Sequence, residues 1–201
     1  QVIRSNKILY LTLVAYAIFG ISIQIFMPYL ILYYNVSLGM DNYVLIMAPA
    51  IIIAAIETAI YGRLYDRRGF AISVLPSLGL LCGGYILLYF YKSTAPVFMG
   101  SLLMMCGYLS GMAVFGAVLR DHTPENKAGM FQGQRIIAQV LIPGVIGPAI
   151  GAAVLSGAEQ ILNSDGTTSF IPHAGIFAAA LAVGAAVTVC VLLTGRKGRK
   201  Q

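Results

Sequence analysis

Six long apolar segments, separated by short polar breaks, account for most of the chain. An α-helix rises about 1.5 Å per residue, so about 20 apolar residues cross the roughly 30 Å hydrocarbon core of a bilayer. Segments long enough for this cover residues 8–33, 43–61, 70–91, 96–119, 136–157 and 173–193. The sequence therefore predicts an all-α, polytopic protein, with a single domain of six transmembrane helices that spans a lipid bilayer.

Basic residues lie on alternate breaks. The two ends of the chain and the breaks after the second and fourth segments contain every lysine and arginine except Lys92. Basic residues are enriched on the cytoplasmic side, so we expect both termini in the cytoplasm and the protein in the plasma membrane. The net charge of +6 follows from this topology. Because no basic patch is interleaved with aromatic residues, we expect no nucleic-acid partner.

The cysteines and glycines indicate no cofactor. Cys82, Cys106 and Cys190 all lie inside apolar segments, without the paired spacing of a metal site or a disulfide framework. No segment contains a phosphate-binding glycine loop, so ATP-driven transport by this chain is not expected. We therefore expect neither a metal nor an organic cofactor.

Two tyrosines are predicted to lie near the middle of the membrane. Tyr16 lies about 12 Å from the cytoplasmic end of its segment, and Tyr108 about 18 Å from the outer end of its own. A hydroxyl at this depth needs a partner or water. Each tyrosine is therefore expected to face either a neighbouring helix or a polar cavity.

Glu57 is the one carboxylate buried within a predicted segment, about 9 Å from the cytoplasmic end. An isolated charge at this depth is costly, so Glu57 should be protonated, paired or in contact with water. Arg135 and Gln139 enter the membrane from the same side and reach a similar depth. Two interpretations stay open: a proton-titrating residue of a symporter or antiporter, and a structural lock to an arginine on a neighbouring helix or on another part of the protein.

The second break carries a specific local motif, Gly-x-Leu-x-Asp-Arg-x-Gly, formed by Gly62, Leu64, Asp66, Arg67 and Gly69. It resembles the cytoplasmic loop motif that joins the second and third helices of each half of a major facilitator superfamily transporter. The match ends after Gly69, where that family has basic residues and this chain has Phe70 and Ala71. The resemblance implies that Gly62, Asp66, Arg67 and Gly69 form a loop that latches the cytoplasmic gate.

Two further stretches support the same resemblance. The fourth break, residues 120–129, looks like the superfamily's loop between the fourth and fifth helices of a half. The fifth segment then contains Gly144, Gly147, Pro148 and Gly151, similar to a glycine and proline pattern that some members carry in that helix. Small residues let helices approach closely, so packing alone also accounts for this pattern.

In that family, six helices form one half of a twelve-helix transporter, and the halves rock about a central site. The basic tail, residues 196–200, resembles the second half better, which implies helices seven to twelve. A half alone would expose half of a cavity. We therefore expect either that this chain, which begins at Gln1, is a fragment, or that it pairs with a second copy or a separate half.

The resemblance also implies where the solute binds. The first and fourth segments line the cavity in this family, so Tyr16, Gln24 and Tyr108 are the candidate substrate-path residues. Gln24 precedes a pair of tyrosines, Tyr33 and Tyr34, by the spacing of the sugar-porter branch. Tyrosine and glutamine offer donors and acceptors without charge, which suits a small neutral solute such as a sugar. Pro28 is expected to bend the first helix beside Gln24.

Alternatives from other classes also follow from the sequence. Ser110 and His173 suggest a rhomboid-like intramembrane serine protease, but the predicted topology separates them by about 21 Å of depth, so we do not expect an enzyme. His173 is then a cap at the start of the sixth helix. A channel or scaffold subunit without coupled transport is the other alternative, although no repeated selectivity loop favours it.

Overall fold

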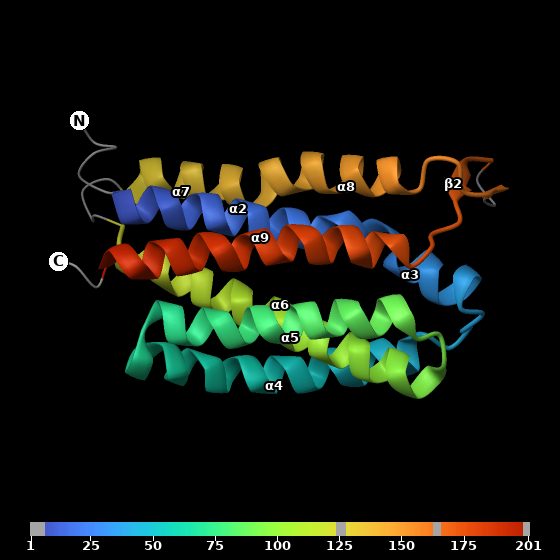
Figure 1. Ribbon diagram of the computed structural model, residues 1–201, viewed down its shortest axis with the longest axis horizontal. Helices are drawn as coiled ribbons and strands as arrows, with labels where there is room; N and C mark the ends of the chain where they lie inside the picture. Colours follow the sequence, from blue (N-terminus) through green and yellow to red (C-terminus); the bar gives the residue numbers. More distant parts are fainter. Residues whose placement is uncertain (1–6, 124–127, 163–165, 199–201) are drawn as a thin grey trace.

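The computed structural model describes residues 7–123, 128–162 and 166–198. Within these ranges, six helical stretches are long and apolar enough to cross a membrane. Figure 1 shows them lying side by side along the long axis of the molecule. The predicted all-α, six-span membrane fold is therefore confirmed.

The first span is irregular, whereas the next three are continuous helices. The first begins as α2 (Lys7–Phe26) and continues through a 3-10 turn, η1 (Met27–Tyr29), α3 (Leu30–Leu32) and a π-helical turn, η2 (Tyr33–Ser37). The others are α4 (Val44–Arg68), α5 (Phe70–Phe90) and α6 (Thr94–Asp121). Pro28 lies in η1 and lacks a backbone N–H, so the regular helix is interrupted next to Gln24, as the sequence predicted.

The fifth span is divided by a second π-helical turn. It consists of α7 (Ala128–Ile136), η4 (Ile137–Leu141) and α8 (Ile142–Val154). A short antiparallel hairpin, β1 (Gln160–Leu162) and β2 (Thr168–Phe170), leads to the last helix, α9 (Gly175–Gly198). The sequence did not predict this hairpin, because each strand has only three residues.

The described arginines gather toward one end of the bundle, which we call the basic end. Here α2 and α7 begin and α4, α6 and α9 end (Figure 1). Lys92 lies in the connection between α5 and α6, at the opposite end. The alternation of basic breaks along the sequence is therefore a segregation of charge in space.

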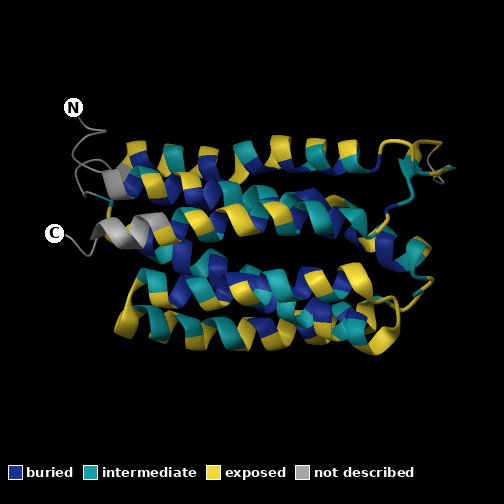
Figure 2. Cartoon of the chain, in the orientation of Figure 1, coloured by how far each residue is buried: buried dark blue, intermediate teal, exposed yellow. Residues whose placement is uncertain are grey.

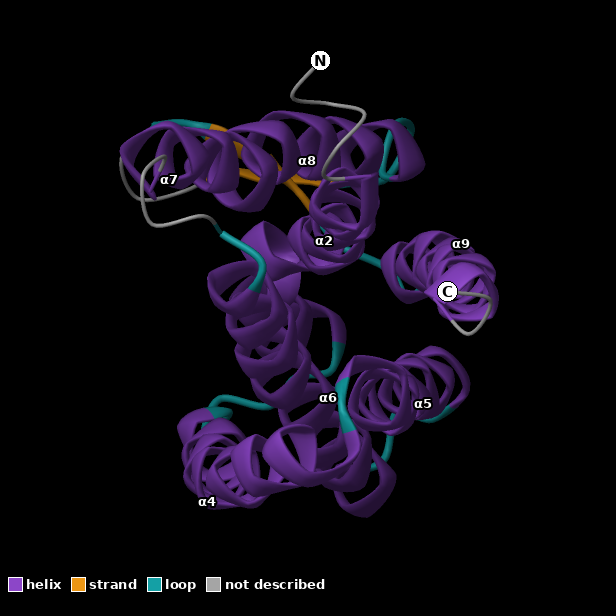
Figure 3. Ribbon diagram, turned by 90° about the vertical axis from the view of Figure 1, so that its left-hand side faces the viewer, coloured by secondary structure: helices purple, strands orange, loops and turns teal. Residues whose placement is uncertain are grey.

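The helices form two groups of three. End-on, α6 lies between α4 and α5, and α2 lies between α8 and α9 (Figure 3). The groups meet where α5 packs on α9 and where α2 contacts α6. A buried polar contact joins three of these helices: the hydroxyl of Ser22 donates to the carbonyl of Ala180 at 2.7 Å and lies 3.2 Å from the hydroxyl of Tyr85.

Glycine allows two helix pairs to approach closely. A Cβ atom at Gly107 would lie 2.3 Å from the backbone nitrogen of Leu81, so α5 and α6 are in backbone contact there. A Cβ atom at Gly147 would lie 2.4 Å from Cβ of Gln24, at the contact of α2 with α8. The glycine pattern of the fifth span therefore serves helix packing, one of the two roles considered for it.

Burial is concentrated on α2 and α6. The most apolar stretches of the first and fourth spans are 61% and 56% buried, whereas those of α4 and of the fifth span are 17% and 22% buried. Figure 2 shows the corresponding exposed residues along α4 and along α7 and α8. The second span (α4) and the fifth span thus flank α2 and α6, and each has an exposed apolar side.

Several predicted boundaries differ from the structure, and two of them bear on the candidate site. The second helix does not end at residue 61 but continues to Arg68, so Gly62, Asp66 and Arg67 lie in its last two turns and not in a loop. The helix continues because arginine is a good helix former and favours a helix C-terminus. Gly69, with φ of 77°, ends it. The fifth helix begins earlier than predicted, at Ala128.

Candidate functional site

Arg135 extends from α7 toward the centre of the bundle. Its Nε donates a long hydrogen bond of 3.4 Å to Oε1 of Gln139, one turn along. Its Nη2 lies 3.5 Å from where a Cβ atom of Gly116 on α6 would be, so the missing side chain leaves room for the guanidinium group. Among the described residues the one ion pair joins Arg120 and Asp121, so no described carboxylate neutralises Arg135.

Gln139 lies in the π-helical turn η4. A π turn inserts one residue into a helix and is frequent at functional sites. Here the turn follows directly after Ile136, the residue next to Arg135. The polar pair on the fifth span therefore lies where its helix is irregular.

Tyr16 lies at the contact between α2 and α6. It is 1% exposed, and its ring stacks on Phe115 with centroids 5.1 Å apart. Its hydroxyl donates to Sδ of Met112 at 3.3 Å. Tyr16 also interacts electrostatically with Arg135 and with Tyr108. Of the two expectations for this tyrosine, it therefore faces a neighbouring helix.

The structure brings together four residues that the sequence had placed in two separate sites. Tyr16 and Tyr108 were predicted to line the substrate path, and Arg135 and Gln139 to belong to a lock. We call Tyr16, Tyr108, Arg135 and Gln139 the Arg135 cluster. It joins α2, α6 and the fifth span, and Tyr108 and Arg135 are half-buried while Tyr16 is buried. The cluster offers hydroxyl, amide and guanidinium groups to a polar ligand.

Gln24 lies apart from this cluster. Its Cβ atom packs against Gly147 at the α2–α8 contact, and its side chain is half-buried. The tyrosine pair that follows it is part of the core. Tyr33 donates to the carbonyl of Leu88 at 3.2 Å, and the hydroxyl of Tyr34 lies 2.7 Å from that of Ser101. Both rings are thus held by neighbouring helices at that end of the bundle.

Glu57 lies on α4, also apart from Arg135. Both carboxylate oxygens are shielded from solvent, and neither has a hydrogen-bond partner among the described residues. The groups in electrostatic contact with it are Tyr61, one turn along α4, and Cys106 of α6. Arg135 bonds to Gln139 instead. The described part of the chain therefore contains no cation that locks Glu57.

A cavity of about 270 Å³ opens at the basic end of the bundle, between α2, the end of α6 and α7. Its walls are Leu9, Leu13, Leu119, Arg120, Thr123, Phe131, Gln132 and Arg135. Four of these residues are buried leucine or phenylalanine side chains. Arg135 therefore connects this cavity with Tyr16 deeper in the bundle.

Comparison with known families decides the identity of this bundle. The sequence pattern of the Major Facilitator Superfamily matches residues 1–148, which include the first four spans and most of the fifth. The chain belongs to this superfamily. Comparisons with curated proteins and with solved structures gave no match. Members of the superfamily are membrane transporters, so this chain is a membrane transporter of the superfamily.

The superfamily motif of the second break forms a helix end. Asp66 and Arg67 are exposed on the last turn of α4, and Gly69 allows α5 to begin immediately. The backbone N–H of Gly69 bonds to the carbonyl of Tyr65 at 2.8 Å. Asp66 is thus placed near the C-terminus of α4. The charged groups of the motif point to the surface of the basic end.

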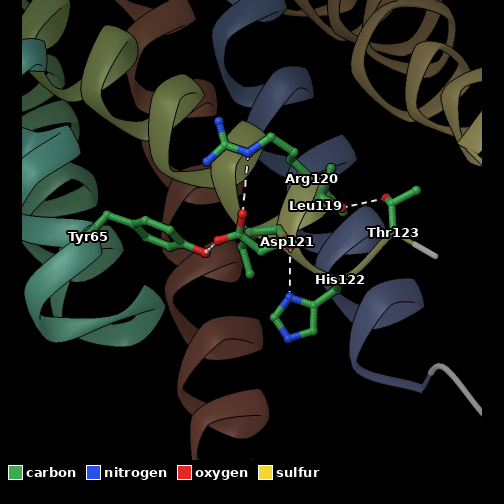
Figure 4. Close-up of polar contacts among 7 residues, drawn as sticks. Tyr65, Leu119, Arg120, Asp121, His122 and Thr123 are labelled. Atoms are coloured by element: carbon green, nitrogen blue, oxygen red, sulfur yellow. Dashed lines mark hydrogen bonds and ion pairs between the residues drawn. The ribbon is translucent and has the colours of Figure 1, made fainter. Parts of the chain in front are cut away.

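The sequence did not predict a polar contact between the last turns of α4 and α6 at the basic end. The hydroxyl of Tyr65 on α4 donates to Oδ2 of Asp121, and Nε of Arg120 donates to Oδ1 of the same carboxylate at 3.3 Å (Figure 4). Next to it, Nδ1 of His122 is 2.9 Å from the carbonyl of Val118. The available signal was the acidic Asp121 within a basic break, but the sequence did not indicate that Tyr65 reaches it.

The serine and histidine of the protease alternative are engaged elsewhere. Ser110 is buried and its hydroxyl donates to the carbonyl of Cys106 within α6. His173 lies at the opposite end, where its Nδ1 accepts a hydrogen bond of 3.1 Å from the backbone of Gly175 at the start of α9. The predicted cap is confirmed, and the two residues form no catalytic pair.

Proposed function

We propose that this chain is one six-helix half of a secondary transporter that moves a small polar solute by alternating access. Membership of the superfamily supports transport. The single observation that supports the proposed site is the Arg135 cluster, because four polar side chains from three spans lie close together there. In this proposal Tyr108 contacts the solute, with Gln139 beside it, and Tyr16, which is buried against α6 in this structure, joins them when the helices move during transport. Gln24 faces α8 and contributes to the path at its edge.

The proposal includes a second six-helix half. The exposed apolar sides of α4 and α8 lie on either side of α2 and α6. In this proposal a second bundle packs against these sides and encloses the solute path. Transporters of this type build their site at the contact between such halves. The second half is either joined to this chain or another copy of it. The assignment of this chain to helices seven to twelve stays a prediction from the basic tail.

Orientation follows the positive-inside rule. The basic end faces the cytoplasm, both termini lie on that side, and the membrane is the plasma membrane. The motif residues Gly62, Asp66, Arg67 and Gly69 then lie at the cytoplasmic gate. In this proposal Asp66 and Arg67 contact the second half when the gate closes, because both are exposed on the surface next to it.

Glu57 is proposed as the proton-carrying residue of a symporter or antiporter. A buried carboxylate without a partner costs several kcal/mol when charged, so it favours its neutral form. The absence of a locking cation among the described residues supports this role over a lock within this chain. A cation supplied by the second half is the competing interpretation, and substitution of Glu57 distinguishes the two.

Solute uptake into proteoliposomes tests the proposal. The chain with its natural flanking sequence would be assayed against neutral sugars and other metabolites, with and without proton and sodium gradients. We expect saturable uptake that weakens in Tyr108→Phe and Gln139→Ala but not in Tyr91→Phe, an exposed tyrosine outside the cluster. A gradient-independent leak that does not saturate would instead support a channel, and no flux from a folded protein would support a scaffold.

A further inference from the structure

The cavity at the basic end has an unusual balance of charge. Two arginines, Arg120 and Arg135, contribute to its walls, and no aspartate or glutamate does so among the described residues. Arg120 is neutralised by Asp121, on the exposed surface. Arg135 has only uncharged partners, Gln139 and the hydroxyl of Tyr16. The cavity therefore carries one positive charge that no described side chain balances.

A guanidinium group at the edge of the hydrocarbon region is costly when, as for Arg135 among the described residues, no carboxylate pairs with it. Buried charges in membranes are almost always paired or in contact with water, and they mark ion or substrate pathways. Guanidinium groups match carboxylate and phosphate groups geometrically, because their planar N–H donors form two parallel hydrogen bonds. A ligand group that neutralises Arg135 is thus expected to be an oxyanion.

The other residues that line the cavity indicate the chemistry of the rest of the ligand. Leu9, Leu13, Leu119 and Phe131 are buried and form an apolar surface. Gln132 adds an exposed amide that can donate a hydrogen bond. Thr123 already donates its hydroxyl proton to the carbonyl of Leu119, so it can only accept. The walls therefore match a molecule with an acid group at one end and a hydrocarbon part at the other.

We propose that this cavity binds the carboxylate or phosphate group of an amphiphilic anion, with Arg135 as the principal contact and the Nη groups of Arg120, whose Nε pairs with Asp121, as the second. The hydrocarbon part lies against Leu13 and Phe131. This chemistry has two sources. One is an acidic solute that enters from the basic end, and the other is an anionic phospholipid of the adjoining leaflet, since basic pockets between helices bind such headgroups. The binding does not depend on the proposed transport.

The two sources have different consequences for the solute. If a phospholipid occupies the cavity, the neutral solute expected from tyrosine and glutamine is retained. If a solute occupies it, the solute carries an acid group and reaches Tyr16 past Arg135. In both cases Arg135 is a binding residue and not merely a mark of topology.

Isothermal titration calorimetry tests the binding directly. The purified full chain in an uncharged detergent would be titrated with hexanoate and with hexanol, which has the same chain length but no charge. We expect hexanoate to bind at least about tenfold more tightly, because a charged hydrogen bond contributes more than a neutral one. Equal affinity for the two ligands would overturn the proposal.

Matched variants assign the binding to the cavity. Arg135→Gln should lose about tenfold or more of the hexanoate affinity, and Arg135→Lys should lose less, since it keeps the charge but not the planar donors. Arg120→Gln tests the second contact at an exposed position, where misfolding is not expected. Lys92→Gln removes one charge at the opposite end and should change nothing. Unchanged affinity in both Arg135→Gln and Arg120→Gln, with normal circular dichroism, would contradict the assignment.

Native mass spectrometry identifies the source. The protein would be extracted from vesicles of phosphatidylcholine alone or mixed with phosphatidylglycerol. Retention of phosphatidylglycerol that is displaced by hexanoate and lost in Arg135→Gln would assign the cavity to lipid. Hexanoate binding without retained phosphatidylglycerol would assign it to an acidic solute. Retention of phosphatidylglycerol that neither hexanoate nor Arg135→Gln changes would place the lipid elsewhere and remove it as the occupant.

Discussion

The hydroxyl of Tyr65 donates a hydrogen bond of 2.8 Å to Oδ2 of Asp121, and this contact connects the last turns of α4 and α6. The two residues are 56 positions apart in the sequence. Because α4 otherwise contacts its group along a narrow stripe through Ile46, Ala50 and Ala54, this polar contact holds its basic end against α6. The superfamily motif begins three residues earlier, at Gly62, so a change at this contact would move the motif.

Tyr65→Phe removes this hydrogen bond and keeps the ring. The contact is partly exposed, so we expect a loss of about 0.5–1.5 kcal/mol in the free energy of unfolding. For a domain of this size, that lowers the melting temperature by about 2–4 °C per kcal/mol. Thermal unfolding in detergent measures it. Tyr61→Phe is the control, because no described hydrogen bond involves the hydroxyl of Tyr61; equal shifts in the two variants would show that the Tyr65 contact does not stabilise α4.

Gly107→Ala should disrupt the contact between α5 and α6. The added Cβ atom would lie 2.3 Å from the backbone of Leu81 and 2.6 Å from the carbonyl of Ser77, and backbone atoms cannot move aside without separating the helices. Overpacking of this kind costs about 1–3 kcal/mol or more. Gly79→Ala is the matched control, since nothing lies within 4 Å of its Cβ position. A melting temperature for Gly107→Ala that equals that of Gly79→Ala would contradict the close approach.

Glu57→Gln should separate proton coupling from solute binding. Glutamine has nearly the same shape but cannot carry the proton, so we expect accumulation driven by a proton gradient to fall, while exchange of solute across the membrane continues. Glu159→Gln, at an exposed position, should leave both intact. Exchange and accumulation would be measured in the same proteoliposomes. If Glu57→Gln instead lowers expression and thermal stability together, a cation from the second half locks Glu57.

Tyr16→Phe should weaken solute binding without unfolding the protein. The ring remains stacked on Phe115, but the hydroxyl that contacts Met112 and Arg135 is lost. Loss of one hydrogen bond to the solute would raise the KM for uptake about five- to tenfold. Tyr10→Phe, closer to the basic end of the same helix, is the control. A KM that is unchanged in Tyr16→Phe would remove this hydroxyl from the proposed path.

The sequence was sufficient for those parts of the structure that depend on local composition. Apolar runs are long and continuous in a membrane protein, so the spans and their number follow from them. Helix ends were less accurate, because charged residues such as Arg63 and Arg67 continue a helix beyond the apolar run. Gly69 marks the true end by its backbone conformation.

The sequence predicted individual residues of the candidate site but not which of them lie together. Depth along the helix indicated that Tyr16, Tyr108 and Arg135 lie inside the membrane, but it carries no information on which faces meet. The grouping of Arg135 with Tyr16, and its separation from Glu57, depends on how α2, α6 and the fifth span pack. The cavity between them is formed by side chains from three helices, and no single segment contains its pattern.

The π-helical turn between α7 and α8 sets the angular relationship between two contacts of the fifth span. Gly147 follows Arg135 by twelve positions, which in a regular helix would place them about 120° apart around the axis. The inserted residue of η4 takes back about 100° of rotation, so Arg135 and Gly147 come to lie within about 20° of each other. One side of the fifth span can therefore contact both Tyr16 and Gln24 on α2. If η4 were a regular α-helical turn with all of its residues retained, the arginine would turn away by about 100° while the glycine contact persisted.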